Sequence, residues 1–367
     1  MRQHIVKLGI LVFTIFLNIL SWNSQTFSDW YIANIMPVWI NTYSRFISIF
    51  PFSVGEKLII LAFLLIIVGI VIFFLGFLKQ DKLKLIRKRY WNIISWIVVC
   101  VLLIQTLNCF ILYHASTFES QYMESTKEYG FEELLNLREN IVKKLNFLSD
   151  QFERDSKGEI IYDKDWNAMY AECIKSMQKL GERYLNLSGY YPKPKRIYFS
   201  KFMSQQYLLG IFFPFTLEAN YNTEMYITNM PYTICHELAH LKGYIYEDEA
   251  NFIAFMACTE SDDLFFQYCG YLNVLNYVAN DFRSNASEDE WNARTMVKEN
   301  VANDNIFLTA DAWEEVNQTS LFKTETVETV ANKLLDSNLK INGIKDGIKS
   351  YSRVVRLLIN YNKGISK

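Results

Sequence analysis

The chain has 367 residues, enough for two or three domains, and it carries 37 basic and 39 acidic side chains. The resulting net charge of −2 argues against a nucleic-acid-binding protein, which usually shows a strongly basic surface. Apolar residues make up 51% of the chain, a high share for a soluble protein, and they concentrate in its first third.

Three apolar segments are predicted to be transmembrane helices, at about residues 8–22, 58–78 and 92–113. The first follows Arg2 and Lys7 as in a signal peptide, but no small-residue cleavage site comes after it, so a short membrane helix is favoured. Gln105 and Asn108 in the third segment are expected to form hydrogen bonds between helices rather than to carry chemistry.

Basic residues predict the orientation of these helices. The connector after the second segment carries Lys79, Lys82, Lys84, Arg87, Lys88 and Arg89. The connector after the first, residues 23–56, carries only Arg45. The positive-inside rule therefore places the N-terminus in the cytoplasm and everything after His114 outside. We expect a multi-pass protein of the cell membrane with an extracytoplasmic C-terminal domain.

From Phe118 the composition becomes that of a soluble domain, so residues 1–117 and 118–367 are predicted to be separate domains. Helical periodicity is seen at residues 119–152, 165–187, 261–276, 288–303, 311–317, 324–335 and 351–361, and a loop at 342–347. Residues 196–200, 210–216 and 224–228 are predicted strands, the last two paired across 220–222. Pro214 makes the second an edge strand or a bulge. The predicted fold class is α+β.

The soluble part contains the pattern H-E-x-x-H, formed by His236, Glu237 and His240. On a helix, residues four apart share one face, so both imidazoles can reach one metal ion. Imidazole suits Zn²⁺, and the glutamate between them lies where it can reach a metal-bound water. The pattern also arises by chance, but here it uses half of the chain's four histidines. Gly243 is expected to end this helix.

A catalytic zinc ion usually takes a third protein ligand. The other two histidines, His4 and His114, lie at the ends of predicted membrane helices, so a carboxylate must serve. Glu247 and Glu249 are the nearest candidates, and both stay open on these grounds.

Residues 214–220, 236–243 and 247–252 together resemble an uncharacterised bacterial family with three N-terminal spans and a C-terminal HExxH domain. The resemblance covers nearly the whole chain. It implies a membrane-anchored protein whose mostly helical, zincin-like domain contains a small mixed sheet, but it supplies no substrate. In zincins an edge strand binds an extended substrate, and residues 212–222 are the candidate edge. Glu218, Asn220 and Asn222 on it are either substrate or calcium ligands or ordinary turn and strand residues.

The motif around Glu247 is also similar to that of glutamate-ligand zinc metallopeptidases, in which the third ligand begins a helix as E-x-x-A-D. The final acid of that motif supports a ligand histidine. Glu247 fits this register, with Asn251 in place of the aspartate, whereas Glu249 does not.

We therefore expect a membrane-anchored zinc metallopeptidase in which His236, His240 and Glu247 hold Zn²⁺ and Glu237 is the general base. Tyr268 and Tyr271 are candidates for stabilising an oxyanion, although core packing is the favoured explanation for both. The expected partners are a peptide or protein substrate and the lipid bilayer, without nucleic acid. The alternative is a non-catalytic zinc-binding sensor or scaffold of the cell envelope, whose metal site would be closed.

Overall fold

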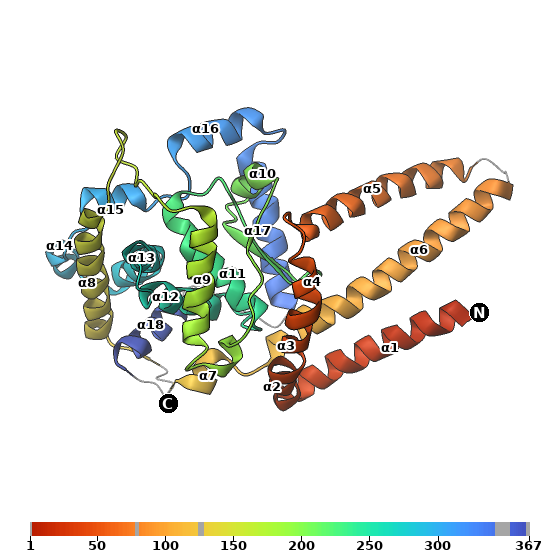
Figure 1. The fold of residues 1–367 in the computed structure, drawn as a ribbon, viewed down its shortest axis with the longest axis horizontal. Coiled ribbons are helices and arrows are strands. Elements are labelled where there is room, and N and C mark those ends of the chain that lie inside the picture. Colours follow the sequence, from red (N-terminus) through yellow and green to blue (C-terminus); the bar gives the residue numbers. More distant parts are fainter. Residues whose placement is uncertain (1, 78–80, 124–127, 342–352, 365–367) are drawn as a thin grey trace. The chain divides into compact units, whose positions relative to one another are not determined.

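The computed structural model describes residues 2–77, 81–123, 128–341 and 353–364, and these form two compact units (Figure 1). Unit 1 consists of Met1–Ala115 together with the separate segment Phe213–Glu218. Unit 2 consists of Ser116–Phe212 and Ala219–Lys367. The first part of unit 1 ends at Ala115, and no feature of the sequence indicated that Phe213–Glu218 would join it.

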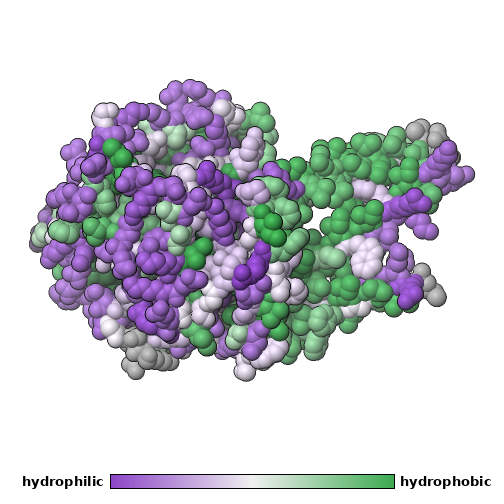
Figure 2. Space-filling model, in the orientation of Figure 1, coloured by the Kyte–Doolittle hydropathy of each residue, from purple (hydrophilic) through white to green (hydrophobic). Residues whose placement is uncertain are grey.

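Unit 1 contains three helices long and apolar enough to cross a membrane: α1 (Arg2–Asn23), α5 (Val54–Leu75) and α6 (Asp81–Gln105), which continues through η2 (Thr106–Phe110) and η3 (Leu112–His114). Apolar side chains cover their surfaces in Figure 2. The first residues of α1, the end of α5 and the start of α6 lie at the same end of this unit (Figure 1). All three predicted apolar segments form helices. Each helix starts before its predicted segment, but α5 ends at Leu75, short of the predicted end at residue 78, which lies outside the described residues.

Short helices connect α1 to α5: α2 (Gln25–Asn34), α3 (Met36–Trp39), η1 (Ile40–Ser44) and α4 (Arg45–Ile47). Polar side chains link the long helices. Asn18 Nδ2 donates to Thr106 Oγ1 (2.8 Å), and Lys7 Nζ donates to Asn92 Oδ1 (2.8 Å). Such bonds stabilise the packing of apolar helices, which have little hydrophobic driving force between them in lipid.

The segment Phe213–Glu218 is held in unit 1 by backbone and side-chain hydrogen bonds. Glu218 accepts the N–H groups of Val54 (3.0 Å) and Gly55 (2.7 Å), the first residues of α5. Ser44 Oγ donates to the Leu217 carbonyl (2.9 Å), and Asn108 Nδ2 donates to the Pro214 carbonyl (2.8 Å). Glu218 therefore satisfies two N–H groups at the N-terminus of α5, and the N-cap residue Ser53 accepts a third, from Glu56 (3.1 Å).

Unit 2 is mostly helical, with α11, α12 and α13 at its centre and α8, α9 and α18 packed around them. Its helices are α7 (Phe118–Tyr122), α8 (Phe131–Leu148), α9 (Trp166–Leu180), α10 (Ser200–Gln205), α11 (Met230–Leu241), α12 (Glu247–Thr259), α13 (Leu264–Asn285), α14 (Glu288–Ala293), α15 (Glu299–Asp304), α16 (Ala310–Thr319), α17 (Thr324–Ile341) and α18 (Val354–Asn362), with short turns η4 (Ser149–Gln151), η5 (Leu185–Leu187) and η6 (Ile227–Asn229). Every residue of α12 from Asp248 to Cys258 is buried, as expected for a helix surrounded by others.

Several predicted helices have different bounds. The helix predicted at 119–152 is divided into α7 and α8, because the chain is extended at Met123. The helix predicted at 288–303 is likewise divided into α14 and α15 by extended backbone at Arg294. The helix predicted at 165–187 ends at Leu180, because the Gly181 backbone packs against Ser188. The predicted loop at 342–347 lies outside the described residues.

The strands differ most from their prediction. β1 (Lys195–Arg196), β2 (Gly210–Phe213) and β3 (Glu218–Tyr221) form a small mixed sheet in the order β1-β3-β2, with β1 parallel to β3. The strand predicted at 224–228 is wrong, since Ile227–Asn229 is a helical turn and β3 lies where a turn was expected. The chain reverses earlier, at Leu217 (φ 52°), so Asn220 and Tyr221 are buried strand rather than turn, and Asn222 directly follows the strand. The edge position predicted for β2 is confirmed.

Candidate metal centre

Helix α11 positions the two histidines. It begins with Pro231 in its first turn, where the missing N–H costs nothing, and nearly all of its residues are buried. It ends before Gly243, whose φ of 97° permits the reversal into α12. The imidazole centroids of His236 and His240 are 4.5 Å apart with their planes at 87°, so both rings face one point.

Glu247, the first residue of α12, faces the same point. Its Oε2 lies 3.1 Å from His236 Nε2 and 3.7 Å from His240 Nε2. Three ligand atoms around a tetrahedral zinc ion with bonds of about 2.0–2.2 Å are separated by roughly 3.3 Å. The three donors are therefore spaced as zinc ligands, and they are the one such group of His, Cys, Asp or Glu among the described residues.

The electrostatics of the cluster also fit a cation. Burial alone would lower the pKa of His240, but the neighbouring Glu247 raises it to about 9. Burial alone would raise the pKa of Glu247, but the two imidazoles hold it well below its usual range. The cluster thus holds an ionised carboxylate that stabilises positive charge on His240, and a bound cation would be stabilised by the same carboxylate.

A backbone carbonyl orients one of the ligands. His240 Nδ1 lies 2.8 Å from the Tyr244 carbonyl, which can only accept, so this nitrogen carries the proton and Nε2 is presented to the cluster. The Asn251 side chain, expected to support a histidine, instead lies with its Nδ2 3.5 Å from Tyr277 Oη. Within the described part of the chain, no hydrogen bond joins Asn251 to a ligand histidine, and the Tyr244 carbonyl orients His240 instead.

Glu249 faces away from this cluster. Its carboxylate accepts the backbone N–H of Phe118 (2.5 Å), the first residue of α7, and the side chain is 4% exposed. Burial, together with the adjacent Asp248, raises the pKa of Glu249 well above its ordinary value. The geometry favours Glu247 over Glu249 as the third ligand, because residues two apart on a helix point in different directions.

Glu237 lies in α11 between the histidines and is buried, with 5% of its surface exposed. Its carboxylate accepts the Phe212 N–H of the edge strand β2. Oε2 has no hydrogen-bond partner among the described residues. Burial raises the pKa of Glu237 to about 7, although the imidazoles oppose the shift. A carboxylate with one oxygen oriented by a backbone N–H and the other available is arranged to take a proton.

Gly210 brings β2 against this glutamate. A Cβ atom at this position would lie 2.5 Å from Glu237 Oε1 and 2.8 Å from Thr233 Cγ2, so any other residue would collide. Sequence reasoning missed Gly210, because a glycine that opens a strand carries no signal for the helix it will contact. It also missed Tyr277, whose pKa is raised to about 12 by burial and further by Glu247. Tyr277 follows the motif by 30 residues, with no spacing to mark it.

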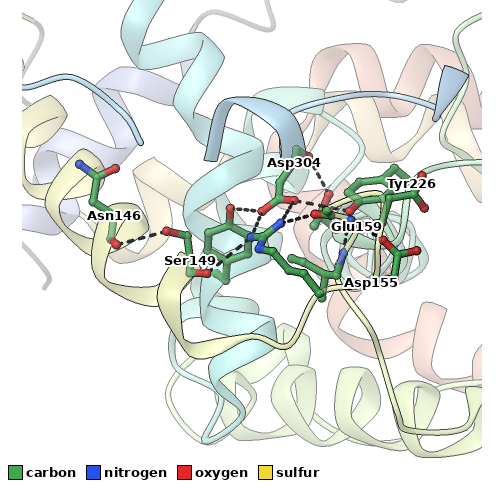
Figure 3. Close-up of polar contacts among 11 residues, drawn as sticks. Asn146, Ser149, Asp155, Glu159, Tyr226 and Asp304 are labelled. Carbon is green, nitrogen blue, oxygen red and sulfur yellow. Dashed lines mark hydrogen bonds and ion pairs between the residues drawn. The ribbon is translucent and has the colours of Figure 1, made fainter. Parts of the chain in front are cut away.

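The Tyr268 hydroxyl belongs to a hydrogen-bond network around Asp304. The ring is fully buried, and its hydroxyl donates to Asp304 Oδ2 (2.6 Å). The same carboxylate accepts Arg154 Nη1 (2.8 Å) and Nη2 (2.7 Å), and Figure 3 shows Asp304 and Tyr226 on this network. The Tyr271 ring packs edge-on against Phe255 with centroids 5.6 Å apart. Core packing, the favoured explanation for both tyrosines, fits these contacts.

The polar residues of the predicted edge also have structural roles. Glu218 caps α5, and Asn220 Nδ2 donates to the Ile211 carbonyl of β2 (3.3 Å). Asn222 Nδ2 donates to Ser204 Oγ (2.9 Å), and its Oδ1 accepts the Glu224 N–H (2.9 Å). They act as turn and strand residues rather than as calcium ligands.

Comparison with known proteins gives one match. The model of the family "Protein of unknown function (DUF3810)" matches residues 31–359. No curated protein matches the chain. No solved structure matches it either.

Proposed function

Because the chain belongs to this family of unknown function, no relative supplies an activity, and we propose from the site alone that the protein is a membrane-anchored zinc metallopeptidase with a zincin-like domain. The observation that carries the proposal is the convergence of His236, His240 and Glu247 beside a buried carboxylate, Glu237, with an unpartnered oxygen.

The donor set fits Zn²⁺. Two imidazole nitrogens and one carboxylate oxygen form the ligand set of many catalytic zinc sites. The cluster supplies three such donors among the described residues, which leaves a position for water or substrate, whereas structural zinc sites usually take four protein ligands. A zinc ion bound here would supply Lewis acidity, lowering the pKa of a water molecule and polarising a carbonyl group.

Residues of the chain would carry out the proton transfer, orient the catalytic groups and bind the substrate. Glu237 takes the proton of the attacking water on its available oxygen and passes it to the leaving amine. The Phe212 N–H holds the other part of the carboxylate, so the acceptor does not rotate away. The Tyr244 carbonyl keeps His240 in the tautomer that binds metal. The edge strand β2 offers backbone groups to an extended peptide, which would add to the sheet as a further strand.

The alternative is a zinc-binding sensor or scaffold without catalysis. A site of that kind needs no general base, so a buried carboxylate costing desolvation energy beside the ligands would have no use. Glu237 is such a group, and the free energy needed to desolvate its carboxylate supports the peptidase proposal.

The proposal is tested with the full-length protein purified from the membrane. Wild type is expected to contain about one zinc ion per chain and His236→Ala little or none, since a catalytic site loses affinity with any ligand. Glu237→Gln is nearly isosteric and should keep both fold and zinc, but its amide cannot accept a proton. Its rate should fall on the order of 10²- to 10⁴-fold.

Because the substrate is not identified, peptides of the envelope and medium are compared by mass spectrometry between cells that carry wild type and Glu237→Gln. Peptides that depend on Glu237 support the peptidase. Identical peptide profiles, with zinc bound in both proteins, would replace it with the sensor or scaffold.

A further inference from the structure

Unit 2 exposes a group of large apolar side chains on α10, on the two residues before it and on the loop between α16 and α17, here called the aromatic patch. Their exposed fractions are 80% for Tyr198, 48% for Phe199, 49% for Phe202, 92% for Leu321 and 66% for Phe322. The two parts are joined, because Gln205 Nε2 at the end of α10 donates to the Phe322 carbonyl (2.7 Å). Single exposed apolar residues are ordinary, but a contiguous group usually marks an interaction surface.

The composition of the aromatic patch suits the boundary between lipid and water. Tyrosine and phenylalanine rings concentrate at that boundary, together with basic residues that reach the headgroups. The exposed Lys323 follows Phe322 directly. The side chains project from a short helix and from a loop tip rather than lining a groove, as suits shallow insertion into a flat surface.

Few residues of chain separate the aromatic patch from unit 1. Gln205, the last residue of α10, is eight residues before Phe213, and a chain of that length spans at most about 28 Å. Phe213 begins the segment that is bonded to Val54 and Gly55, the residues at which the apolar helix α5 starts. A domain of about 250 residues has a radius of gyration of about 18 Å, so a tether of 28 Å is shorter than its diameter.

We propose that the aromatic patch inserts into the surface of the bilayer and holds unit 2 against the membrane, as a contact additional to the three spans. The patch would then limit the protein to substrates presented at the membrane surface, since β2, at the candidate active site, begins five residues after α10. The insertion itself does not depend on catalysis, whereas the restriction of substrates rests on the proposed function.

The test uses the full chain in vesicles of phosphatidylethanolamine and phosphatidylglycerol. Cys100→Ser removes the exposed thiol, and the other five cysteines are buried. Phe202→Cys and Leu321→Cys are made singly in this background and labelled with a nitroxide. Leu185→Cys, 75% exposed and outside the aromatic patch, is the matched control. One label per chain verifies that the buried thiols stay protected and that each variant is folded.

Collisions of the nitroxide with oxygen, which partitions into lipid, are compared with collisions with a water-soluble nickel chelate. The ratio of oxygen to nickel collisions is expected to be several-fold higher at 202 and 321 than at 185. Equal ratios at all three positions would overturn the proposal. So would spin–spin broadening that disappears on dilution with unlabelled chain, because a second copy would then cover the patch.

Discussion

Glu247 and Glu249 of α12 are only two residues apart, but their carboxylates have different partners. Glu247 faces the histidines, and Glu249 accepts the N–H of Phe118. Glu247→Gln is therefore expected to lose most of the bound zinc, whereas Glu249→Gln should keep it, measured as zinc per chain by elemental analysis. Glu249→Gln serves as the control because it makes the same chemical change on the same helix. Zinc lost from Glu249→Gln and kept by Glu247→Gln would move the third ligand to Glu249.

Gly210 gives a second prediction for single residues. An alanine at 210 places a methyl group 2.5 Å from Glu237 Oε1, so either the strand or the carboxylate must move. Small displacements of a catalytic group can cost roughly 10²-fold in rate. Gly210→Ala should lose peptidase activity by about that factor while keeping zinc. Gly130→Ala, where a Cβ would meet nothing within 4 Å, is the control and should behave as wild type. A fully active Gly210→Ala would show that β2 does not position Glu237.

Glu247 and Gly210 show which parts of the candidate site could be predicted from the sequence and which could not. The histidine pair and Glu247 were predictable, because a helix converts a spacing of four into a shared face and a following acid can meet it across a short turn. Gly210 and the Tyr244 carbonyl were not predictable, since their contacts depend on how two elements pack. Every residue has a backbone carbonyl, so the sequence does not identify the one that orients His240. Gly210 matters here because it has no Cβ atom, which lets β2 lie against Glu237.

At the scale of elements, the salt bridge between Arg154 and Asp304 joins α15 to the chain that follows α8. The two side chains are 13% and 1% exposed. Asp304→Ala removes the acceptor of the Tyr268 hydroxyl and the ionic partner of Arg154, whose guanidinium keeps the carbonyl of Gly158 as an acceptor. Removing one partner of a buried ion pair costs about 3–5 kcal/mol of unfolding free energy. Thermal or denaturant unfolding of the purified protein measures this loss.

The exposed pair Lys157 and Asp311 is the matched control, with side chains 61% and 74% exposed. Asp311→Ala should leave the unfolding midpoint unchanged, because solvent screens such a pair. If Asp304→Ala were no less stable than Asp311→Ala, the network around Asp304 would be of no consequence to the fold.

Helices were predicted better than strands for a physical reason. The apolar periodicity of α8 or α13 extends over several turns, whereas each strand of this sheet has only two to four residues. Too few alternations are present in such short strands to identify them. In β3 the polar Asn220 suggested a turn, because the sequence does not show that neighbouring backbone would satisfy its amide.

For the whole molecule, orientation in the membrane is the first question. The start of α1, with Arg2 and Lys7, and the start of α6, with Lys82 and Lys84, lie at the same end of unit 1 (Figure 1). The positive-inside rule assigns this end to the cytoplasm. A reporter that functions only in the cytoplasm, fused after Lys367, should therefore be silent, while the same reporter fused at the N-terminus should be active. An active C-terminal fusion would reverse the proposed topology.

Composition predicted a division between an apolar first part and a more polar remainder, but it did not predict which residues belong to each unit. Residues 213–218 include Pro214 and Leu217 and look like any strand and turn of a soluble domain. Their place in unit 1 depends on hydrogen bonds to Ser44, Val54 and Gly55 that only the folded chain brings together.

This segment makes the membrane unit depend on a part of the chain that is synthesised late. Val54 and its acceptor Glu218 are 164 residues apart. At 5–20 residues per second, the ribosome needs roughly 8 to 30 s between them. During that interval the N–H groups at the start of α5 lack their final partner, although the spans themselves are already made. A chain that terminates before Glu218 would thus lack the acceptor of the Val54 and Gly55 N–H groups, and its first apolar unit would remain incompletely bonded although all three spans had been made.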